Sequence, residues 1–250
     1  MAGVSVLLEV RGIRKAYGAI RAVDGVSFSV RTGEILGVIG PNGSGKTTMF
    51  NAVLGQVRPD AGEVMFEGRD VSGIGALALA RRGIGRTFQS LQVFGGLSVR
   101  DNLIVAGQEF VGSAGSRLFA RPDAGMGQRA EEIIELFRIG HVAHLAAGSL
   151  SYGQQKLVDI AMAFMARPRL VLLDEPCAGV NPALIDELME LLRRLNREQG
   201  ASFVVIEHNM DFVMRLCSRV ICLAMGTILA EGEPAEVQGN RAVLEAYLGV

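Results

Sequence analysis

The sequence contains few cysteines, and they lie far apart. Cys177, Cys217 and Cys222 are the only three in 250 residues, too few and too scattered for a disulfide framework or a zinc site. Sparse cysteines of this kind are typical of a protein from a reducing cytosol. The length is ample for a buried core without such cross-links, and it allows one large domain or a core with a subdomain.

The sequence also lacks an excess of one charge sign and long apolar runs. The formal net charge is −1, so no global basic field would attract nucleic acid, and we expect none as a partner. No apolar run approaches the ~20 residues that a membrane helix needs, and residues 1–10 lack the pattern of a secretory signal. Hydrophobic residues still make up 49% of the chain. Buried parallel strands would explain part of this fraction, and a partner interface could explain the rest.

One short stretch predicts a phosphate-binding loop. Residues 40–48 read GPNGSGKTT and fit the pattern G-x-x-x-x-G-K-[ST]. An apolar run at 34–39 precedes the loop and a helical pattern at 48–55 follows it, which is the setting that the motif requires. In such a loop backbone N–H groups surround phosphate oxygens, Lys46 would reach the β- and γ-phosphates, and the Thr47 hydroxyl would ligate Mg²⁺. The sequence therefore predicts a nucleoside triphosphate as ligand.

Apolar periodicity along the chain predicts a mixture of strands and helices. Besides the run at 34–39, the predicted strands are two within 6–31, then 63–66, 169–173, 202–206, 220–223 and 227–230. The predicted helices, besides the one after the loop, are 76–82, 97–106, one from Gln128, one ending at Ala166, one starting at Asn181-Pro182, and a last one that closes the chain. Residues 107–127, rich in Gly, Ser and Ala, are interpreted as a surface excursion.

Two carboxylates stand at the end of a predicted strand. Asp174 and Glu175 directly follow the apolar residues 170–173. An acidic residue there can hold Mg²⁺ through its coordinated water, and the next one can orient and polarise a water for attack on the γ-phosphate. A single carboxylate at a strand end is often a solvated loop acid. Two in a row, in a chain with a phosphate-binding loop, indicate a hydrolytic site.

Taken in order, these motifs resemble those of the ATP-binding cassette (ABC) ATPases. Residues 150–154 read LSYGQ, similar to the LSGGQ signature of that family. Further elements in family order are the phosphate-binding loop at 40–48, Gln89, Asp174-Glu175, a loop at 178–182 and His208. The resemblance covers nearly the whole chain and implies an α/β, P-loop NTPase fold of the cassette type. Such a fold has a mixed sheet core, an antiparallel β subdomain and an inserted helical subdomain.

The resemblance also implies a division of the chain and roles for single residues. A single cassette would span 6–250, with a nucleotide-binding core at 6–90 and 167–250 and a helical signature subdomain at 91–166. Glu175 would be the general base, His208 and Lys46 would hold the γ-phosphate, and Gln89 would sense that phosphate and Mg²⁺. The metal would be held by Thr47, Gln89 and Asp174. Tyr17 would stack on adenine, and the phosphates of ATP would be bound by Asn42, Gly43, Ser44, Gly45, Lys46, Thr47 and Thr48.

The signature would serve a different ATP molecule. In this family two cassettes pair head to tail, and each signature completes the site of the other. Ser151, Gly153 and Gln154 would therefore contact the ATP that a second cassette binds, consistent with the preference of a helix N-terminus for anions. Tyr152 replaces the first glycine of the signature, a change familiar in the amino-acid import branch. Asn181 stands where many cassettes have aspartate, and it can cap the helix that follows.

Local motifs resemble one branch, the high-affinity branched-chain amino-acid importers. They are GRTFQ at 85–89, LSYGQ at 150–154, AGVNP at 178–182, EHNM at 207–210 and the ending AYLG at 246–249. The excursion at 107–127 resembles that of the larger ATPase subunit of these systems. Urea and amide importers and the lipopolysaccharide exporter share several of these motifs, so another transporter is the alternative. A cassette protein that acts on DNA or ribosomes is disfavoured, because the chain has one cassette, no heptads and no basic patch.

The branch implies partners and a place in the cell. The chain would lie on the cytoplasmic face of the cell membrane as a peripheral subunit, beneath two transmembrane permease subunits. A paralogous ATPase or a second copy of itself would pair with it. An extracytoplasmic substrate-binding protein would be an indirect partner.

Overall fold

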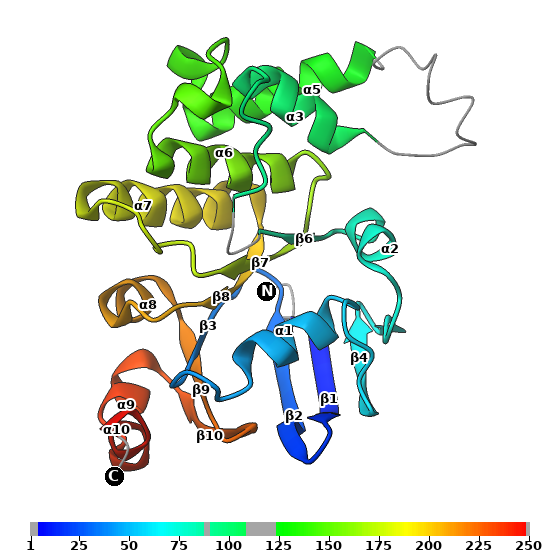
Figure 1. Cartoon of the computed structure of the whole chain (residues 1–250), viewed down its shortest axis with the longest axis vertical. Helices are drawn as coiled ribbons and strands as arrows, with labels where there is room; N and C mark the ends of the chain where they lie inside the picture. The colour runs from blue at the N-terminus through cyan, green and yellow to red at the C-terminus, as the bar shows by residue number, and fades with distance from the viewer. Residues whose placement is uncertain (1–4, 88–90, 109–123, 249–250) are drawn as a thin grey trace.

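The computed structural model describes residues 5–87, 91–108 and 124–248. Two β-sheets occupy the lower part of the molecule in Figure 1, and a group of helices lies above them. This arrangement confirms the predicted fold class, an α/β fold with a mixed sheet core, an antiparallel sheet and inserted helices.

The smaller sheet is antiparallel throughout. Its strands are β1 (Val6–Tyr17), β2 (Ile20–Arg31), β4 (Ala61–Phe66) and β5 (Arg69–Asp70), in the spatial order β2-β1-β4-β5. Alternate residues such as Val26, Phe28 and Val30 are buried, as expected for strands with one face on a core. The strands predicted at 6–31 and 63–66 are thereby confirmed.

The larger sheet is mixed. It consists of β3 (Ile35–Ile39), β6 (Ile84–Arg86), β7 (Leu170–Asp174), β8 (Ser202–Ile206), β9 (Arg219–Ala224) and β10 (Thr227–Gly232), in the order β10-β9-β3-β8-β7-β6. Only β10 runs antiparallel to its neighbour. Because parallel strands bring their carboxyl ends to one edge of a sheet, the loops after the adjacent strands β3, β8 and β7 emerge together.

The central strands separate two cores. Every residue of β3, β7 and β8 is buried, which explains why these strands read as continuous apolar runs. Leu36 and Val38 pack into the core shared with the antiparallel sheet. Ile35 and Ile39 face the core shared with the helices.

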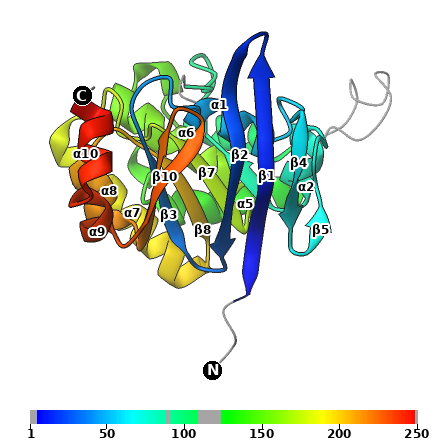
Figure 2. The same ribbon diagram turned by 90° about the horizontal axis from the view of Figure 1, so that it is seen from below.

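Nine α-helices complete the described part of the chain. They are α1 (Lys46–Val53), α2 (Ala76–Arg81), α3 (Val99–Gly107), α5 (Ala124–Phe137), α6 (Tyr152–Phe164), α7 (Pro182–Gln199), α8 (Met210–Leu216), α9 (Pro234–Gln238) and α10 (Arg241–Leu248). Helices α3, α5 and α6 form the upper group in Figure 1. Figure 2 shows α9 and α10 beside β10, on the side of the molecule away from β1 and β4. Within the described ranges, no helix combines the length and the apolar character that a membrane crossing requires.

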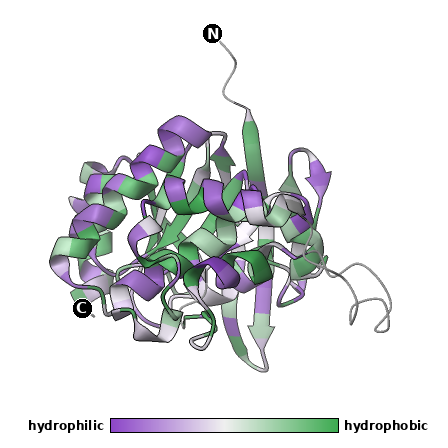
Figure 3. Ribbon diagram, turned by 90° about the horizontal axis from the view of Figure 1, so that it is seen from above, coloured by the Kyte–Doolittle hydropathy of each residue, from purple (hydrophilic) through white to green (hydrophobic). Residues whose placement is uncertain are grey.

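Local sequence explains the helices. Asn181 caps α7 by accepting a hydrogen bond from the backbone N–H of Ala183 (3.0 Å), with Pro182 at the first helical position. The apolar face of α7 is buried at Leu188, Leu191, Leu192 and Leu195. Seen from above in Figure 3, the helices alternate hydrophilic and hydrophobic residues, and they lie over mainly hydrophobic strands.

Most predicted elements lie within two residues of the observed bounds, but the short strands β5 and β6 were not predicted, and the helices differ in three places. Helix α5 starts at Ala124, inside the predicted excursion, because Met126 packs against the core although its neighbours are glycines. Residues 109–123 of that excursion lie outside the described residues. Helix α8 was not predicted, since seven residues are too few to show a period. The closing helix is in fact two, α9 and α10.

Candidate active site

The phosphate-binding loop connects β3 to α1, and its glycines are required by geometry. Gly40 has φ 146° and Gly45 has φ 102°, a region that side chains rarely allow. A Cβ on Gly45 would lie 2.2 Å from the Ala22 carbonyl oxygen, and one on Gly40 would lie 2.1 Å from that of Leu223. The loop is thus held tightly between β2 and β9.

Lys46 lies inside the loop and interacts with its backbone. Its Nζ donates to the carbonyl oxygens of Gly40 (2.7 Å) and Pro41 (3.0 Å), and the residue is only 5% exposed. Burial lowers the pKa of Lys46, and the nearby carboxylates of Glu175 and Asp174 oppose this shift. A buried ammonium group of this kind is stabilised by an anionic partner.

The start of α1 has the properties of an anion site. Ser98, Ser151, Asn181 and Asn209 each cap their helices (α3, α6, α7 and α8) with a side-chain oxygen. Among the described residues no side chain caps α1 in this way. Its first backbone N–H groups, with Lys46 and Thr47 beside them, fit a phosphate group. Gly43 and Asn42 lie in the same loop, and a Cβ on Gly43 would meet nothing within 4 Å.

The carboxyl ends of β7 and β8 bring the predicted catalytic residues together. Nε2 of His208 lies 3.2 Å from Oε1 of Glu175. Glu175 has a positive φ of 49°, a strained conformation for a non-glycine residue that is common at active sites. Its N–H donates to the carbonyl of Ile206 (2.9 Å), so β8 fixes the strained residue. At 3.2 Å the two side chains are in direct contact, so the imidazole can orient the carboxylate that would accept a proton from water.

Asp174 is the last residue of β7 and is 5% exposed. Nη2 of Arg86 lies 3.5 Å from its Oδ2. Burial raises the pKa of Asp174, whereas the Arg86 guanidinium lowers it. No group of three or more His, Cys, Asp or Glu residues in the described ranges could hold a metal ion.

The signature lies elsewhere in the fold. Ser151 and Gln154 form a capping box at the start of α6, with Ser151 Oγ accepting from Gln154 N–H (3.3 Å) and Gln154 Oε1 accepting from Ser151 N–H (3.1 Å). A Cβ on Gly153 would lie 2.0 Å from Leu184 Cδ2, so α6 needs a glycine where it meets α7. Ser151 is exposed, and α6 lies in the upper helical group, apart from α1 (Figure 1). The chain therefore does not bring its own signature to its own phosphate-binding loop.

One further predicted residue lies at the edge of this arrangement. Tyr17 ends β1 with 51% of its surface exposed, and Nζ of Lys15 lies 5.7 Å from its ring centroid. The ring is accessible for stacking. Gln89 lies outside the described residues.

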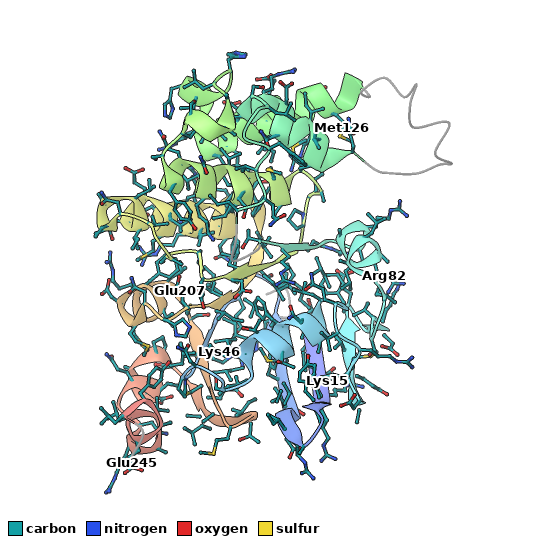
Figure 4. The ribbon with its side chains drawn as sticks, viewed as in Figure 1. Lys15, Lys46, Arg82, Met126, Glu207 and Glu245 are labelled. Carbon is teal, nitrogen blue, oxygen red and sulfur yellow. The ribbon has the colours of Figure 1, made fainter. Side chains whose placement is uncertain are left out.

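Sequence reasoning gave no role to Glu207, although the residue connects the two catalytic loops. Its Oε1 accepts from the N–H of Cys177 (2.6 Å), and its Oε2 accepts from the N–H groups of His208 (2.8 Å) and Asn209 (3.0 Å). The residue is 3% exposed. Figure 4 shows Lys46 and Glu207 in the central part of the molecule, below the upper helices. A buried acid after an apolar strand was the signal that could have identified it.

All three thiols are buried, and their chemistry follows from this. Burial raises the pKa of Cys177 above its usual range, raises that of Cys217 to about 12, and also raises that of Cys222. We expect iodoacetamide at pH 7.5 to leave the native protein unmodified and its ATP hydrolysis unchanged, because the thiolate is the nucleophile. Mass spectrometry would detect the modification, with the urea-unfolded chain as a positive control. Alkylation of native Cys177 with loss of turnover would contradict this expectation.

Comparisons with known proteins agree with this geometry. The model of the ABC transporter family matches residues 23–178, and that of the branched-chain amino acid ATP-binding cassette transporters matches residues 227–250. The high-affinity branched-chain amino acid transport ATP-binding protein BraF of Pseudomonas aeruginosa is 35% identical over 97% of this chain and 98% of its own length. The lipopolysaccharide export system ATP-binding protein LptB of Escherichia coli is 37% identical over 97% of each chain.

Solved structures share the whole fold. A nucleotide-free ATP-binding cassette from an ABC transporter has a TM-score of 0.89 and 34% identity, covering 98% of this chain and 100% of that one. A bacterial ABC transporter cassette solved as a dimer has a TM-score of 0.75 and 26% identity, covering 91% and 99%. Since the family model spans more than half of the sequence and the relatives align along nearly all of it, the chain belongs to the ABC transporter family and is one of its ATP-hydrolysing subunits.

Proposed function

We propose that the chain provides the energy for import of branched-chain amino acids. The observation that carries this proposal is the match of residues 227–250 to the model of branched-chain amino acid ATP-binding cassette transporters. The similarity to BraF along 97% of the chain supports it. The similarity to LptB favours a second candidate, an ATPase of a lipopolysaccharide exporter, and urea and amide importers are a further alternative.

In the proposed reaction each residue acts from its observed position. The N–H groups at the start of α1 and the ammonium of Lys46 bind the phosphates of ATP, and Tyr17 stacks on adenine. Glu175 accepts the proton of the attacking water, and His208, 3.2 Å away, orients that water and the γ-phosphate. Glu207 positions His208 by accepting its backbone N–H (2.8 Å).

The residues present also fit a magnesium ion. When bound, Mg²⁺ neutralises charge on the β- and γ-phosphates. Thr47, which is exposed at the start of α1, would hold it through its hydroxyl, together with Asp174 and Gln89. Burial raises the pKa of Asp174 in spite of the opposing Arg86 guanidinium, so a cation next to this carboxylate would stabilise its charged form.

We further propose that two cassettes share their ATP sites. The exposed Ser151 at the N-terminus of α6 and the uncapped start of α1 would meet across a head-to-tail pair, each contributing one side of the phosphate cradle. The purified chain would pair with a second copy, and a paralogous ATPase would take that place in the cell. The division into a core at 6–90 and 167–250 and a helical subdomain at 91–166 would let the two parts respond separately to ATP.

The proposed setting is a membrane transporter. Two transmembrane permease subunits would bind the chain on the cytoplasmic face of the membrane, and an extracytoplasmic binding protein would act through them. Closure of the pair on ATP and its release after hydrolysis would move the permease between two states.

Uptake of labelled leucine tests the transported molecule. Cells that lack the gene would be rescued with the wild type or with Glu175→Gln, each expressed to the same level. We expect only the wild type to restore uptake, because transport requires hydrolysis. If leucine uptake never depends on the gene, while a defect in lipopolysaccharide export or in urea uptake appears, the branched-chain assignment is wrong.

A further inference from the structure

The C-terminal helix reaches the phosphate-binding loop. Helix α10 is anchored by Val243, which is 2% exposed and belongs to the core shared with the helices. From this anchored helix the Tyr247 hydroxyl accepts a hydrogen bond of 2.7 Å from the backbone N–H of Gly40. Figures 1 and 2 show α10 on the same side of the molecule as β9 and β10. The two residues are 207 positions apart in the chain.

Gly40 is the residue on which the loop depends. Its carbonyl oxygen accepts from Nζ of Lys46 at 2.7 Å, so a shift of Gly40 displaces the ammonium that would bind phosphate. No side chain fits on Gly40, because a Cβ would lie 2.1 Å from the Leu223 carbonyl oxygen and 2.8 Å from Ser44 Oγ. The Tyr247 hydroxyl thus holds this residue at its N–H, whereas the lysine contact is at its carbonyl oxygen.

A second contact from the same part of the chain holds the loop. The N–H of Gly226, in the turn between β9 and β10, donates to the carbonyl oxygen of Ser44 (3.0 Å), and its own carbonyl accepts from Asp24 N–H (2.8 Å). The C-terminal segment therefore contacts the loop near its beginning and near its end. Burial raises the pKa of Tyr247, so its hydroxyl stays neutral at physiological pH.

We propose that Tyr247 is a positioning residue of the nucleotide site, which fixes Gly40 and, through Gly40, the ammonium of Lys46. Helix α10 is then a part of the ATP site rather than a surface appendage. A phosphate-binding loop works because its N–H groups and its lysine are held in place before the ligand arrives. The inference rests on ATP binding by this chain and is independent of the molecule transported.

Tyr247→Phe tests the proposal, because it removes only the hydroxyl and keeps the ring. We expect the Kd and the KM for ATP to rise roughly 3- to 10-fold, because the Gly40 N–H loses its hydrogen-bond acceptor. One neutral hydrogen bond typically contributes this much. The kcat should stay within about twofold, since Glu175 and His208 are untouched. The thermal midpoint without nucleotide should stay close to that of the wild type. Hydrogen exchange at the Gly40 amide should become faster, which a purely structural role of the ring would not predict.

Leu244→Ala is the matched control. Leu244 lies on the same helix and is 50% exposed, so its truncation tests helix packing without touching the Gly40 contact. It should leave the KM for ATP and exchange at Gly40 unchanged. A wild-type KM in Tyr247→Phe would overturn the proposal. Equal losses of affinity in both variants would also overturn it, because the effect would then come from the helix and not from the hydroxyl.

Discussion

Glu175→Gln is expected to reduce ATP turnover by roughly 10²- to 10⁴-fold, the usual contribution of a general base, while ATP still binds. The amide keeps the size of the side chain and its place 3.2 Å from His208 Nε2, but it cannot accept a proton from water. The phosphate-binding loop and Lys46 are unchanged, so the Kd for ATP should stay within a few-fold of wild type. Phosphate release measures turnover, and equilibrium titration with a fluorescent ATP analogue measures binding.

A second Glu→Gln variant controls for the loss of a negative charge. Glu198 is exposed on α7, and Glu198→Gln should hydrolyse ATP at the wild-type rate. Full turnover by Glu175→Gln would remove Glu175 as the base. Loss of ATP binding in Glu175→Gln would mean that the Glu175 carboxylate supports the phosphate-binding loop instead.

Mixing two inactive variants is expected to restore activity. Lys46→Ala removes the phosphate ligand of a chain's own site, and Ser151→Ala removes the signature hydroxyl that a partner would use. Each alone should be nearly inactive. A 1:1 mixture should recover about one quarter of the wild-type rate, because half of the pairs formed at random are mixed and each mixed pair has one complete site. Turnover measured against the mixing ratio checks this.

Ser98→Ala separates the shared site from helix stability. Ser98 caps α3 just as Ser151 caps α6, each accepting an N–H bond in the first turn (3.0 and 3.3 Å). Each substitution should cost about 1 kcal/mol of stability through the lost cap. Only Ser151→Ala should lower turnover. If the mixture of inactive chains stays inactive, or if Ser98→Ala loses as much turnover, the shared site is wrong for pairs of this chain.

Local signals were sufficient to predict most of the fold. The strands β3, β7 and β8 are buried along their whole length, so their sequences are short apolar runs that stand out. The loop at 40–48 lies between such a strand and a helix, which makes its motif specific. The same logic placed Asp174 and Glu175 at a strand end, because a buried strand leaves its carboxyl end at the ligand-binding edge.

The contacts that refine the site are long-range, and no local pattern predicts them. Arg86 lies 3.5 Å from Asp174, and Tyr247 accepts from Gly40 across 207 positions. Glu207 stands next to His208 in sequence, but its bond to Cys177 N–H appears only when β7 and β8 pair. Helix α8 was missed because it is short, and the start of α5 because glycines hid its helical period.

The molar mass of Glu175→Gln in solution, measured by light scattering with and without ATP and Mg²⁺, shows whether two copies of the chain close around shared ATP. Without nucleotide the mass should be that of the 26.6 kDa chain. With saturating nucleotide it should double, and Lys46→Ala in the same background should abolish the doubling. A monomer that binds ATP to saturation without pairing would contradict the account.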